Sequence, residues 1–192
     1  MRTVTARLLP PVCLLLLVAC SGIPSTVAPG EPPSASGPTV VLLVRHAEKA
    51  TDGGEDPSLT PAGKQRAEAL VEVAGSAGVS AILATQYRRT RETAQPLADR
   101  LGIPVAVHEV VSGGAQAHAT ALARDVLERH RGQSVLVVGH SNTVPLLVEA
   151  LAGIPVQPIA DSEYDRLFVV VVPPSGPARL VQTRYGVRTT TP

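Results

Sequence analysis

The stretch VVLLVRHAEKA (residues 40–50) joins an apolar run to a cluster of charged side chains. Its first five residues are all Val or Leu, as in a strand that is buried on both faces of a sheet. Four titratable side chains then follow within five positions: Arg45, His46, Glu48 and Lys49. They stand where a buried strand reaches the surface, so they are either a solvated strand end or a site at which His46 reacts.

Similar apolar runs recur along the chain, at residues 81–84, 105–107, 135–138 and 167–172 and more weakly at 178–183. Helical patterns lie between them. One begins at Thr60-Pro61, with Thr as the N-cap and Pro at the first helical position. The others cover residues 90–101, 119–131 and 144–151, and Pro96 is expected to kink or divide the first of these. Strands that alternate with helices predict an α/β fold, a three-layer α/β/α sandwich around a mainly parallel sheet.

The first twenty residues have a different character from the rest of the chain. A short basic region is followed by the apolar residues 8–19, which are too few to span a bilayer as a helix. The run ends in Leu17-Val-Ala-Cys20, which resembles the lipobox of a bacterial lipoprotein, where the signal is cut before the Cys and the Cys receives lipid. The alternative is an ordinary secretory signal that is cut elsewhere.

We therefore expect three parts: a signal peptide (1–19), a lipidated Cys20 with a flexible tether (20–38) and a folded domain (39–192). Residues 21–38 are rich in Pro, Ser, Gly and Ala and cannot bury enough apolar surface to order themselves. The membrane is then a partner through the lipid anchor, and the domain lies outside the cytoplasm in the cell envelope.

The composition of the expected mature chain excludes several classes of function. Cleavage removes Arg2 and Arg7 and leaves 15 Lys and Arg against 16 Asp and Glu, so a basic surface for nucleic acid is not indicated. Aromatic residues make up only 2% of the chain, which argues against stacking platforms for bases. Both cysteines lie in the first twenty residues, so a Cys nucleophile or a Cys-ligated metal in the domain is excluded.

Polar side chains follow the predicted strands at their carboxyl ends, where ligands collect in such folds. The first four strands deliver, in order, Arg45-His46, Arg88-Arg89, His108-Glu109 and Gly139-His140. His46 and His140, together with the arginines at the same edge, would repel one another unless an anion lies among them. The planar guanidinium of Arg fits phosphate oxygens.

These residues form a complete set for phosphoryl transfer through a phosphohistidine, with no metal or other cofactor required. His46 can be the nucleophile if its other ring nitrogen is held by a hydrogen bond. His140 and the start of the helix that follows it favour the developing negative charge. Glu109 is placed to protonate the leaving oxygen.

Four motifs occur in order over nearly the whole segment from residue 39 on: VRHAEK (44–49), LTPAG (59–63), RTRETA (89–94) and GHS (139–141). In turn they resemble the RHG or RHA signature, the LTxxG helix start, the RAxxTA segment and the GH motif of the histidine phosphatase superfamily, also called phosphoglycerate-mutase-like. A single RH dipeptide means nothing, but the ordered set is specific. The Asn that many mutase-type members carry shortly after the first motif is missing here.

The resemblance implies a role for each matching residue. The family phosphorylates the position of His46 and clamps the phosphoryl group with the positions of Arg45, Arg89 and His140. Most members have an acidic proton donor between the second Arg and the later His, and Glu109 holds that approximate place. Its surroundings, VHEVVSGG, match the family motif poorly, and a plain surface carboxylate is the alternative.

The family match implies a phosphatase acting on a phosphomonoester, either a small molecule or a phosphoprotein. The alternatives are a phosphoglycerate-mutase-type phosphotransferase and a phosphate-binding lipoprotein with little catalysis. We expect specificity to lie in loops 51–58 and 111–118.

The other charged residues have plainer expected roles. Arg88 and Arg91 are expected to be solvated helix charges. His118 and His130 would suggest a metal site if they shared a helix face, but twelve residues rotate a helix by about 120° and put them on different faces. We expect both to be exposed. The acidic segment with Asp161, Glu163 and Asp165 is read as a solvated loop, with a role near the pocket mouth as the alternative.

Overall fold

The computed structural model describes residues 36–52, 54–110 and 114–189. The chain divides into two compact units, Met1–Glu31 and Pro32–Pro192, and the described residues all belong to the second. The predicted signal, the lipobox and Cys20 lie outside the described residues, so these expectations stay predictions.

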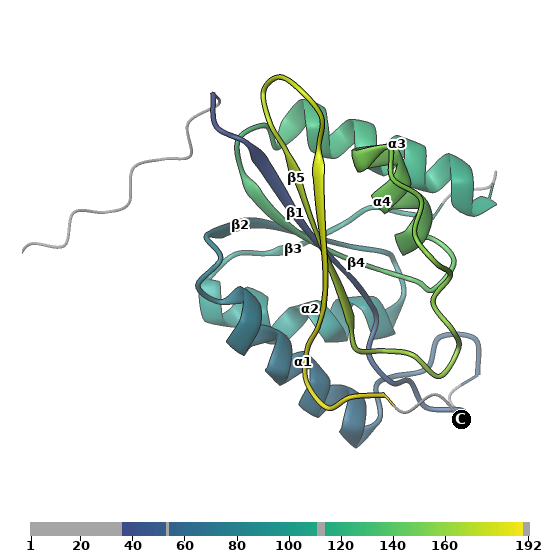
Figure 1. The fold of residues 1–192 in the computed structure, drawn as a ribbon. Helices are drawn as coiled ribbons and strands as arrows, with labels where there is room; N and C mark the ends of the chain where they lie inside the picture. The colour runs from purple at the N-terminus through teal and green to yellow at the C-terminus, as the bar shows by residue number, and fades with distance from the viewer. Residues whose placement is uncertain (1–35, 53, 111–113, 190–192) are drawn as a thin grey trace, which may run out of the picture. The chain divides into compact units, whose positions relative to one another are not determined.

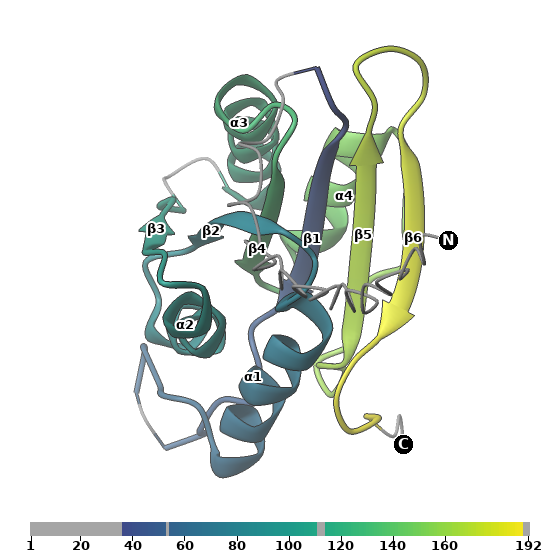
Figure 2. The same cartoon turned by 90° about the vertical axis from the view of Figure 1, so that its left-hand side faces the viewer.

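A six-stranded sheet forms the centre of the second unit, in the order β3-β2-β4-β1-β5-β6 (Figures 1 and 2). The strands are β1 (Thr39–Arg45), β2 (Val79–Ala84), β3 (Val105–Val107), β4 (Ser134–Gly139), β5 (Arg166–Val172) and β6 (Arg179–Arg184). Neighbours are parallel from β3 through β2 and β4 to β1, whereas β5 is antiparallel to β1 and β6 to β5. The carboxyl ends of the first four strands therefore meet at one edge.

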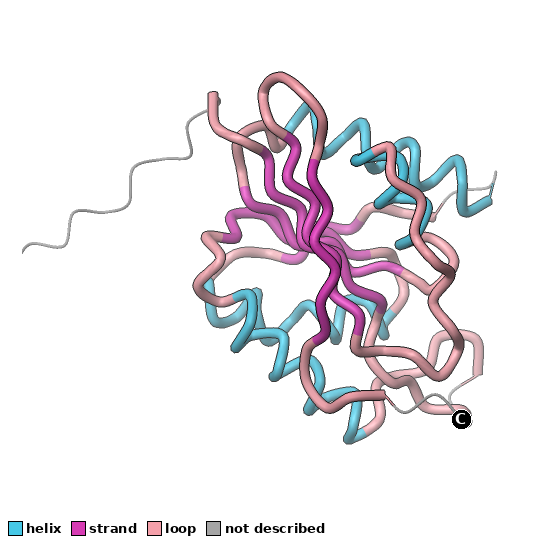
Figure 3. The backbone as a smooth tube through the Cα atoms, in the orientation of Figure 1, coloured by secondary structure: helices cyan, strands magenta, loops and turns pink. Residues whose placement is uncertain are grey.

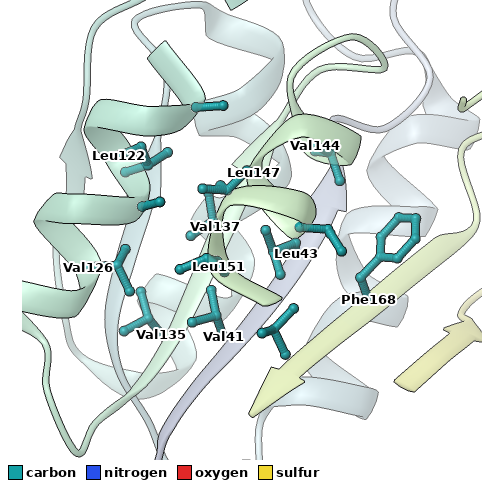
Figure 4. Packing of buried hydrophobic residues seen from close by; sticks show 14 of the residues in the cluster. Val41, Leu43, Leu122, Val126, Val135, Val137, Val144, Leu147, Leu151 and Phe168 are labelled. Atoms are coloured by element: carbon teal, nitrogen blue, oxygen red, sulfur yellow. The ribbon is translucent and has the colours of Figure 1, made fainter. Parts of the chain in front are cut away.

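Helices cover both faces of the sheet, as predicted (Figure 3). They are α1 (Pro61–Ala74), α2 (Arg88–Leu101), α3 (Gly114–Arg129) and α4 (Val144–Ala152). α1 and α2 pack on one face through Leu70, Ala94 and Leu97. α3 and α4 pack on the other face, where Leu122, Val126, Leu147 and Leu151 meet Val41 and Leu43 of β1 (Figure 4). The predicted three-layer fold with a mainly parallel sheet is confirmed.

The start of α1 explains the spacing of the LTPAG motif. Thr60 is the N-cap, as predicted, and its side chain accepts a hydrogen bond from the N–H of Gly63. The N–H of Thr60 donates to the carbonyl of Glu48 at 2.8 Å. A Cβ on Gly63 would overlap the same carbonyl oxygen, so only glycine lets α1 approach the segment that follows His46 so closely.

Two helices differ in detail from the predictions. Pro96 lies inside α2 without dividing it, because Ala94, Leu97 and Ala98 on either side of it are buried against the sheet and hold the helix together. α3 begins at Gly114 rather than at residue 119. The part of the expected loop 111–118 that is described, residues 114–118, is therefore helical, and residues 111–113 lie outside the described part of the chain.

Candidate active site

The pairing of β1 with β4 brings two motifs together at the carboxyl edge of the sheet. Arg45 is in register with Gly139, and the N–H of His46 donates to the carbonyl of Gly139 at 2.9 Å. The rings of His46 and His140 consequently lie edge to face, with centroids 5.5 Å apart. Residues almost a hundred positions apart in sequence thus share one site because their strands are neighbours.

His46 is buried, and one of its ring nitrogens is already fixed. Nδ1 lies 2.8 Å from the carbonyl oxygen of Ala47, which can only accept, so Nδ1 carries the hydrogen and donates it. The lone pair of the neutral ring is then on Nε2. Burial, together with the positive charges of Arg45 and Arg89, lowers the pKa of His46 to about 4. At neutral pH the side chain is an uncharged imidazole with a nucleophilic Nε2.

Arg45 is held by the segment between α4 and β5. Its Nη1 donates to the carbonyls of Ala160, Asp161 and Glu163, at 2.9, 2.9 and 3.0 Å. Its guanidinium carbon lies 4.1 Å from the centroid of the Tyr164 ring. The Nε atom of Arg45 is buried and has no hydrogen-bond partner among the described residues.

The acidic segment is therefore a support for Arg45, and its interpretation as a solvated loop was wrong. Asp165 is fully buried and accepts hydrogen bonds from Nη1 of Arg184 and the N–H of Thr189. Glu163 is also largely covered and pairs with Arg184 at 2.8 Å. Only Asp161 is an exposed acidic side chain of the expected kind. The segment's place beside Arg45 was the alternative in the sequence interpretation.

Arg89 lies in the first turn of α2 and mirrors Arg45. Its guanidinium carbon lies 4.3 Å from the centroid of the Tyr87 ring. Its Nη1 is 3.8 Å from Oδ1 of Asp56, and Asp56 also accepts a hydrogen bond from the N–H of Arg88. The Nε atom of Arg89, like that of Arg45, is buried without a partner among the described residues. The positive charge of Arg89 reaches both histidines, since it lowers the pKa of each.

His140 follows β4 directly and is held by a side chain rather than by the backbone. Its Nε2 lies 3.0 Å from Oγ1 of Thr85, at the end of β2. Burial, followed by the nearby His46 and Arg89, lowers the pKa of His140 to about 3. Both histidines are therefore neutral near pH 7, and each has one ring nitrogen that makes no hydrogen bond to the described residues.

The remaining motif residues hold the segment after His46 in place. The N–H of Ala47 donates to Oγ1 of Thr93, which itself donates to the carbonyl of Arg89. Glu48 pairs with the buried Arg66 at 2.7 Å, so it does not simply face water. Lys49 forms an isolated backbone bridge with Leu59. The RH, LTPAG and RTRETA motifs are thus parts of one hydrogen-bonded unit.

Glu109 lies just after β3, at the same edge of the sheet, with an exposed side chain. The backbone carbonyl of Glu109 accepts a hydrogen bond from Nδ1 of His118, over a distance of 3.2 Å. The structure does not bring the Glu109 carboxylate into contact with His46 or His140. Its role as a proton donor stays a prediction.

His118 was expected to be exposed, and this was wrong. The early start of α3 puts it on the buried face of the helix, 2% exposed, with its ring 5.2 Å from that of His108. His130 is half-buried beyond the helix end and bonds to Gln133. The two do not meet, as predicted. Arg88 and Arg91 are exposed helix residues, also as predicted.

Sequence reasoning missed several side chains that shape this site: Thr85, Thr90, Tyr87, Tyr164 and Asp56. Two of the chain's three tyrosines lie against the two arginines. In the sequence analysis, the low aromatic content was used only as an argument against stacking platforms for bases. Because the chain has so few aromatic residues, the position of each tyrosine could also have indicated a site. Tyr87 lies two residues before Arg89, and this closeness was the available signal.

Comparisons with known proteins agree with this geometry. Residues 41–111 match the sequence model of the histidine phosphatase superfamily (branch 1). A 71-residue segment is 37% identical to the probable phosphoglycerate mutase GpmB of Enterobacter sp. (strain 638), and covers 34% of this chain and 33% of that protein. The chain thus spans about a third of the length of the curated relative that it matches.

Solved structures share the fold. A mycobacterial glucosyl-3-phosphoglycerate phosphatase is 17% identical, with a TM-score of 0.58 over 73% of this chain and 96% of that one. The protein histidine phosphatase SixA, complexed with tungstate, is 22% identical, with a TM-score of 0.60 over 76% of this chain and 96% of that one. The fold is that of the histidine phosphatases. The sequence similarity to the histidine phosphatase superfamily covers residues 41–111, which are less than half of the chain.

Proposed function

We propose that the chain is a phosphatase that hydrolyses a phosphomonoester through a phosphohistidine at His46, without a metal. One observation carries the proposal. The Nε groups of Arg45 and Arg89 are buried donors without partners among the described residues, and the charges of both arginines act on a neutral His46 whose Nε2 makes no hydrogen bond to the described residues. A buried donor without a partner is costly, and a phosphoryl group would satisfy both Nε groups at once.

The reaction follows from these groups in two displacements. In the first, the lone pair of His46 Nε2 forms a bond to phosphorus while the bond from phosphorus to the ester oxygen breaks. In the second, water attacks the phosphohistidine, loses a proton, and inorganic phosphate leaves as the N–P bond breaks. Arg45 and Arg89 hold the equatorial oxygens and stabilise their charge, and His140 donates to one of them once it has taken up a proton in the complex with the anion.

Glu109 is the proposed proton donor to the leaving oxygen, because it follows a strand that ends at the same edge of the sheet. Leaving-group dependence tests this role separately from the rest. Glu109→Gln should slow the hydrolysis of an alkyl phosphate by about 10²-fold and leave 4-nitrophenyl phosphate, whose leaving group needs no proton, little changed. Equal rates for wild type and variant on both substrates would remove Glu109 from the mechanism.

The primary test is turnover of an aryl phosphate by the purified full chain, with and without chelator. We expect chelator-resistant turnover that vanadate inhibits and that His46→Ala abolishes. Arg91→Gln, a change at an exposed position of α2, is the matched control and should retain activity. No turnover of any phosphomonoester would favour a phosphate-binding protein. Loss of activity with chelator would show that a metal takes part.

A mutase is the second candidate, because the curated relative is named a probable phosphoglycerate mutase. The two activities differ in what accepts the phosphoryl group from His46. A phosphatase gives inorganic phosphate in water, whereas a mutase returns the group to a hydroxyl of the organic acceptor. Incubation with a phosphoglycerate and measurement of released phosphate against isomerised product separates them.

We also propose that the protein is exported and anchored in the cell envelope through a lipid on Cys20, with the domain outside the cytoplasm. The support is the LVAC sequence after a short apolar run and the tether that follows. In the described part of the chain, no helix has the length and apolarity needed to cross a membrane. Metabolic labelling with a fatty acid should label the wild type and Cys13→Ala but not Cys20→Ala.

A further inference from the structure

We propose that Thr85 and Thr90 are positioning residues that hold neutral His140 with its hydrogen on Nε2, so that Nδ1 is the nitrogen that takes up a proton when a phosphoryl group binds and then donates it in a hydrogen bond to a phosphoryl oxygen. The use of Nδ1 by a phosphoryl group rests on the function proposed above. The position of the hydrogen does not, because it follows from hydrogen bonds of the protein alone.

The direction of the bonds is fixed by counting hydrogens. Oγ1 of Thr90 lies 2.7 Å from the carbonyl of Tyr87 and 3.1 Å from the carbonyl of Thr85. A carbonyl only accepts, so the one hydroxyl hydrogen of Thr90 is used there. Oγ1 of Thr85 lies 2.9 Å from Oγ1 of Thr90, and this contact is a hydrogen bond only if Thr85 donates.

The acceptor role of Thr85 determines which nitrogen of His140 carries the hydrogen. With its hydrogen given to Thr90, Oγ1 of Thr85 can only accept from Nε2 of His140, 3.0 Å away. Nε2 therefore carries a hydrogen, and the lone pair of neutral His140 is on Nδ1, opposite to the arrangement in His46. One histidine presents Nε2 to the site and the other presents Nδ1.

The two threonine hydroxyls are buried, so water does not compete for their hydrogen bonds. Thr85 is 2% exposed and Thr90 is 0% exposed. The chain also links the two sides of the phosphate site, since Thr90 follows Arg89 in α2 and its acceptor is the carbonyl of Tyr87. The ring of Tyr87 in turn meets that of His140 edge to face, with centroids 5.3 Å apart.

The experiment observes the tautomer directly in the full chain, labelled with ¹⁵N-histidine and free of ligand. Long-range ¹H–¹⁵N correlation spectra distinguish Nε2–H from Nδ1–H, and comparison with His140→Asn assigns the signals. The wild type should show His140 as Nε2–H. Thr85→Val faces Nε2 with a methyl group, so most of the population should move to Nδ1–H. Thr85→Ser keeps the hydroxyl and should restore the wild-type pattern.

Activity provides the second readout. Thr85→Val should lower kcat on an aryl phosphate by about 10–100-fold, the range typical of lost orienting contacts, and Thr85→Ser should recover most of it. If Thr85→Val does not fold, Thr90→Val takes its place, because it frees the Thr85 hydroxyl to donate to Nε2 and should also move the hydrogen to Nδ1.

The outcomes separate the two proposals. An Nδ1–H tautomer in the wild type, or an unchanged tautomer and kcat in Thr85→Val, would overturn the positioning role. A wild type without phosphatase activity but with the expected tautomer shifts would leave the positioning role intact and overturn the proposed function.

Discussion

The site has two halves that look alike and are built differently. In each, an arginine lies on a tyrosine ring beside a histidine: Arg45 on Tyr164 next to His46, and Arg89 on Tyr87 close to His140. The first half is held by backbone carbonyls, one on His46 and three on Arg45. The second is held by side chains, Thr85 on His140 and Asp56 near Arg89.

This difference separates what is fixed by the fold from what can be changed by substitution. A backbone carbonyl stays in place when side chains around it are replaced, so the hydrogen bonds that hold His46 and Arg45 do not depend on the identity of neighbouring side chains. The second histidine and arginine depend on the side chains of Thr85 and Asp56, and Thr85 in turn contacts Thr90. The predictions below test this contrast.

The largest effect is expected from the two histidines. His46→Asn removes the proposed nucleophile, so turnover should fall by at least about 10⁴-fold. His140→Asn removes the proposed donor that forms when His140 takes up a proton, and this should cost about 10²–10³-fold. Steady-state rates on an aryl phosphate measure both. Similar losses in the two variants would contradict the distinct roles.

The arginines should separate activity from stability. Arg45→Lys and Arg89→Lys both lose a planar fork, and each should lower kcat/KM by about 10²-fold. Only Arg45 also ties down three carbonyls of the segment before β5. Arg45→Lys should therefore lower the free energy of unfolding by about 1.5–3 kcal/mol, whereas Arg89→Lys should change it little. Thermal unfolding checks this, and an equal loss in both variants would count against the contrast.

Gly63→Ala tests the packing of α1 on the segment after His46. A Cβ would overlap the carbonyl of Glu48, so the helix must shift. Overpacking of this kind costs about 1–3 kcal/mol. Alanine also gains about 1 kcal/mol over glycine in helix propensity. The overpacking cost exceeds this gain toward the upper end of its range, so we expect a net loss of stability. Lys64→Ala, at an exposed neighbour, is the control. The account expects lower stability and a reduced kcat for Gly63→Ala, and an unaffected enzyme would argue against it.

The stability of the protein should depend on pH through both histidines. Their pKa values in the folded state, about 4 and about 3, lie below the ordinary 6.5 of the unfolded chain. Between these values the unfolded state binds more protons, so stability is fully present above about pH 6.5 and falls as the pH drops toward 4. His140→Asn should flatten the dependence of the melting temperature on pH in this window. If the melting temperature depended on pH in the same way in the wild type and the variant, His140 would have the ordinary pKa of a solvated histidine.

The smallest effect is expected at Asp56. Its carboxylate is 40% exposed and lies 3.8 Å from Arg89, and exposed pairs of this kind contribute at most about 1 kcal/mol. Asp56→Asn should raise KM by no more than about fivefold and leave kcat unchanged. A collapse of kcat would assign Asp56 a chemical role.

The sequence was sufficient for the parts of the molecule that depend on local pattern. The Val-rich runs predicted all six strands, and Thr60-Pro61 predicted the first residue of α1. These local patterns do not determine the order of the strands in the sheet. Parallel strands, however, have their carboxyl ends at the same edge, so it could be predicted that His46 and His140 lie close together.

What the sequence did not reveal depends on tertiary contacts. Pro96 stays within a helix because burial of its neighbours outweighs the missing hydrogen bond. His118 is buried because α3 starts one turn early, although its spacing with Leu122 and Val126 at i, i+4 and i+8 was a readable signal. The three carbonyls on Arg45 come from a segment more than a hundred residues away, and no local pattern marks them.

The central claim is that His46 becomes phosphorylated, and trapping the intermediate tests it most directly. The full chain is mixed with ³²P-labelled phosphomonoester, stopped in alkali, where phosphohistidine survives, and the labelled peptide is identified. We predict label on His46 in the wild type, label that is lost in acid, and none in His46→Asn. Label on another residue, or turnover without any labelled enzyme in both rapid and steady-state quenches, would contradict the account.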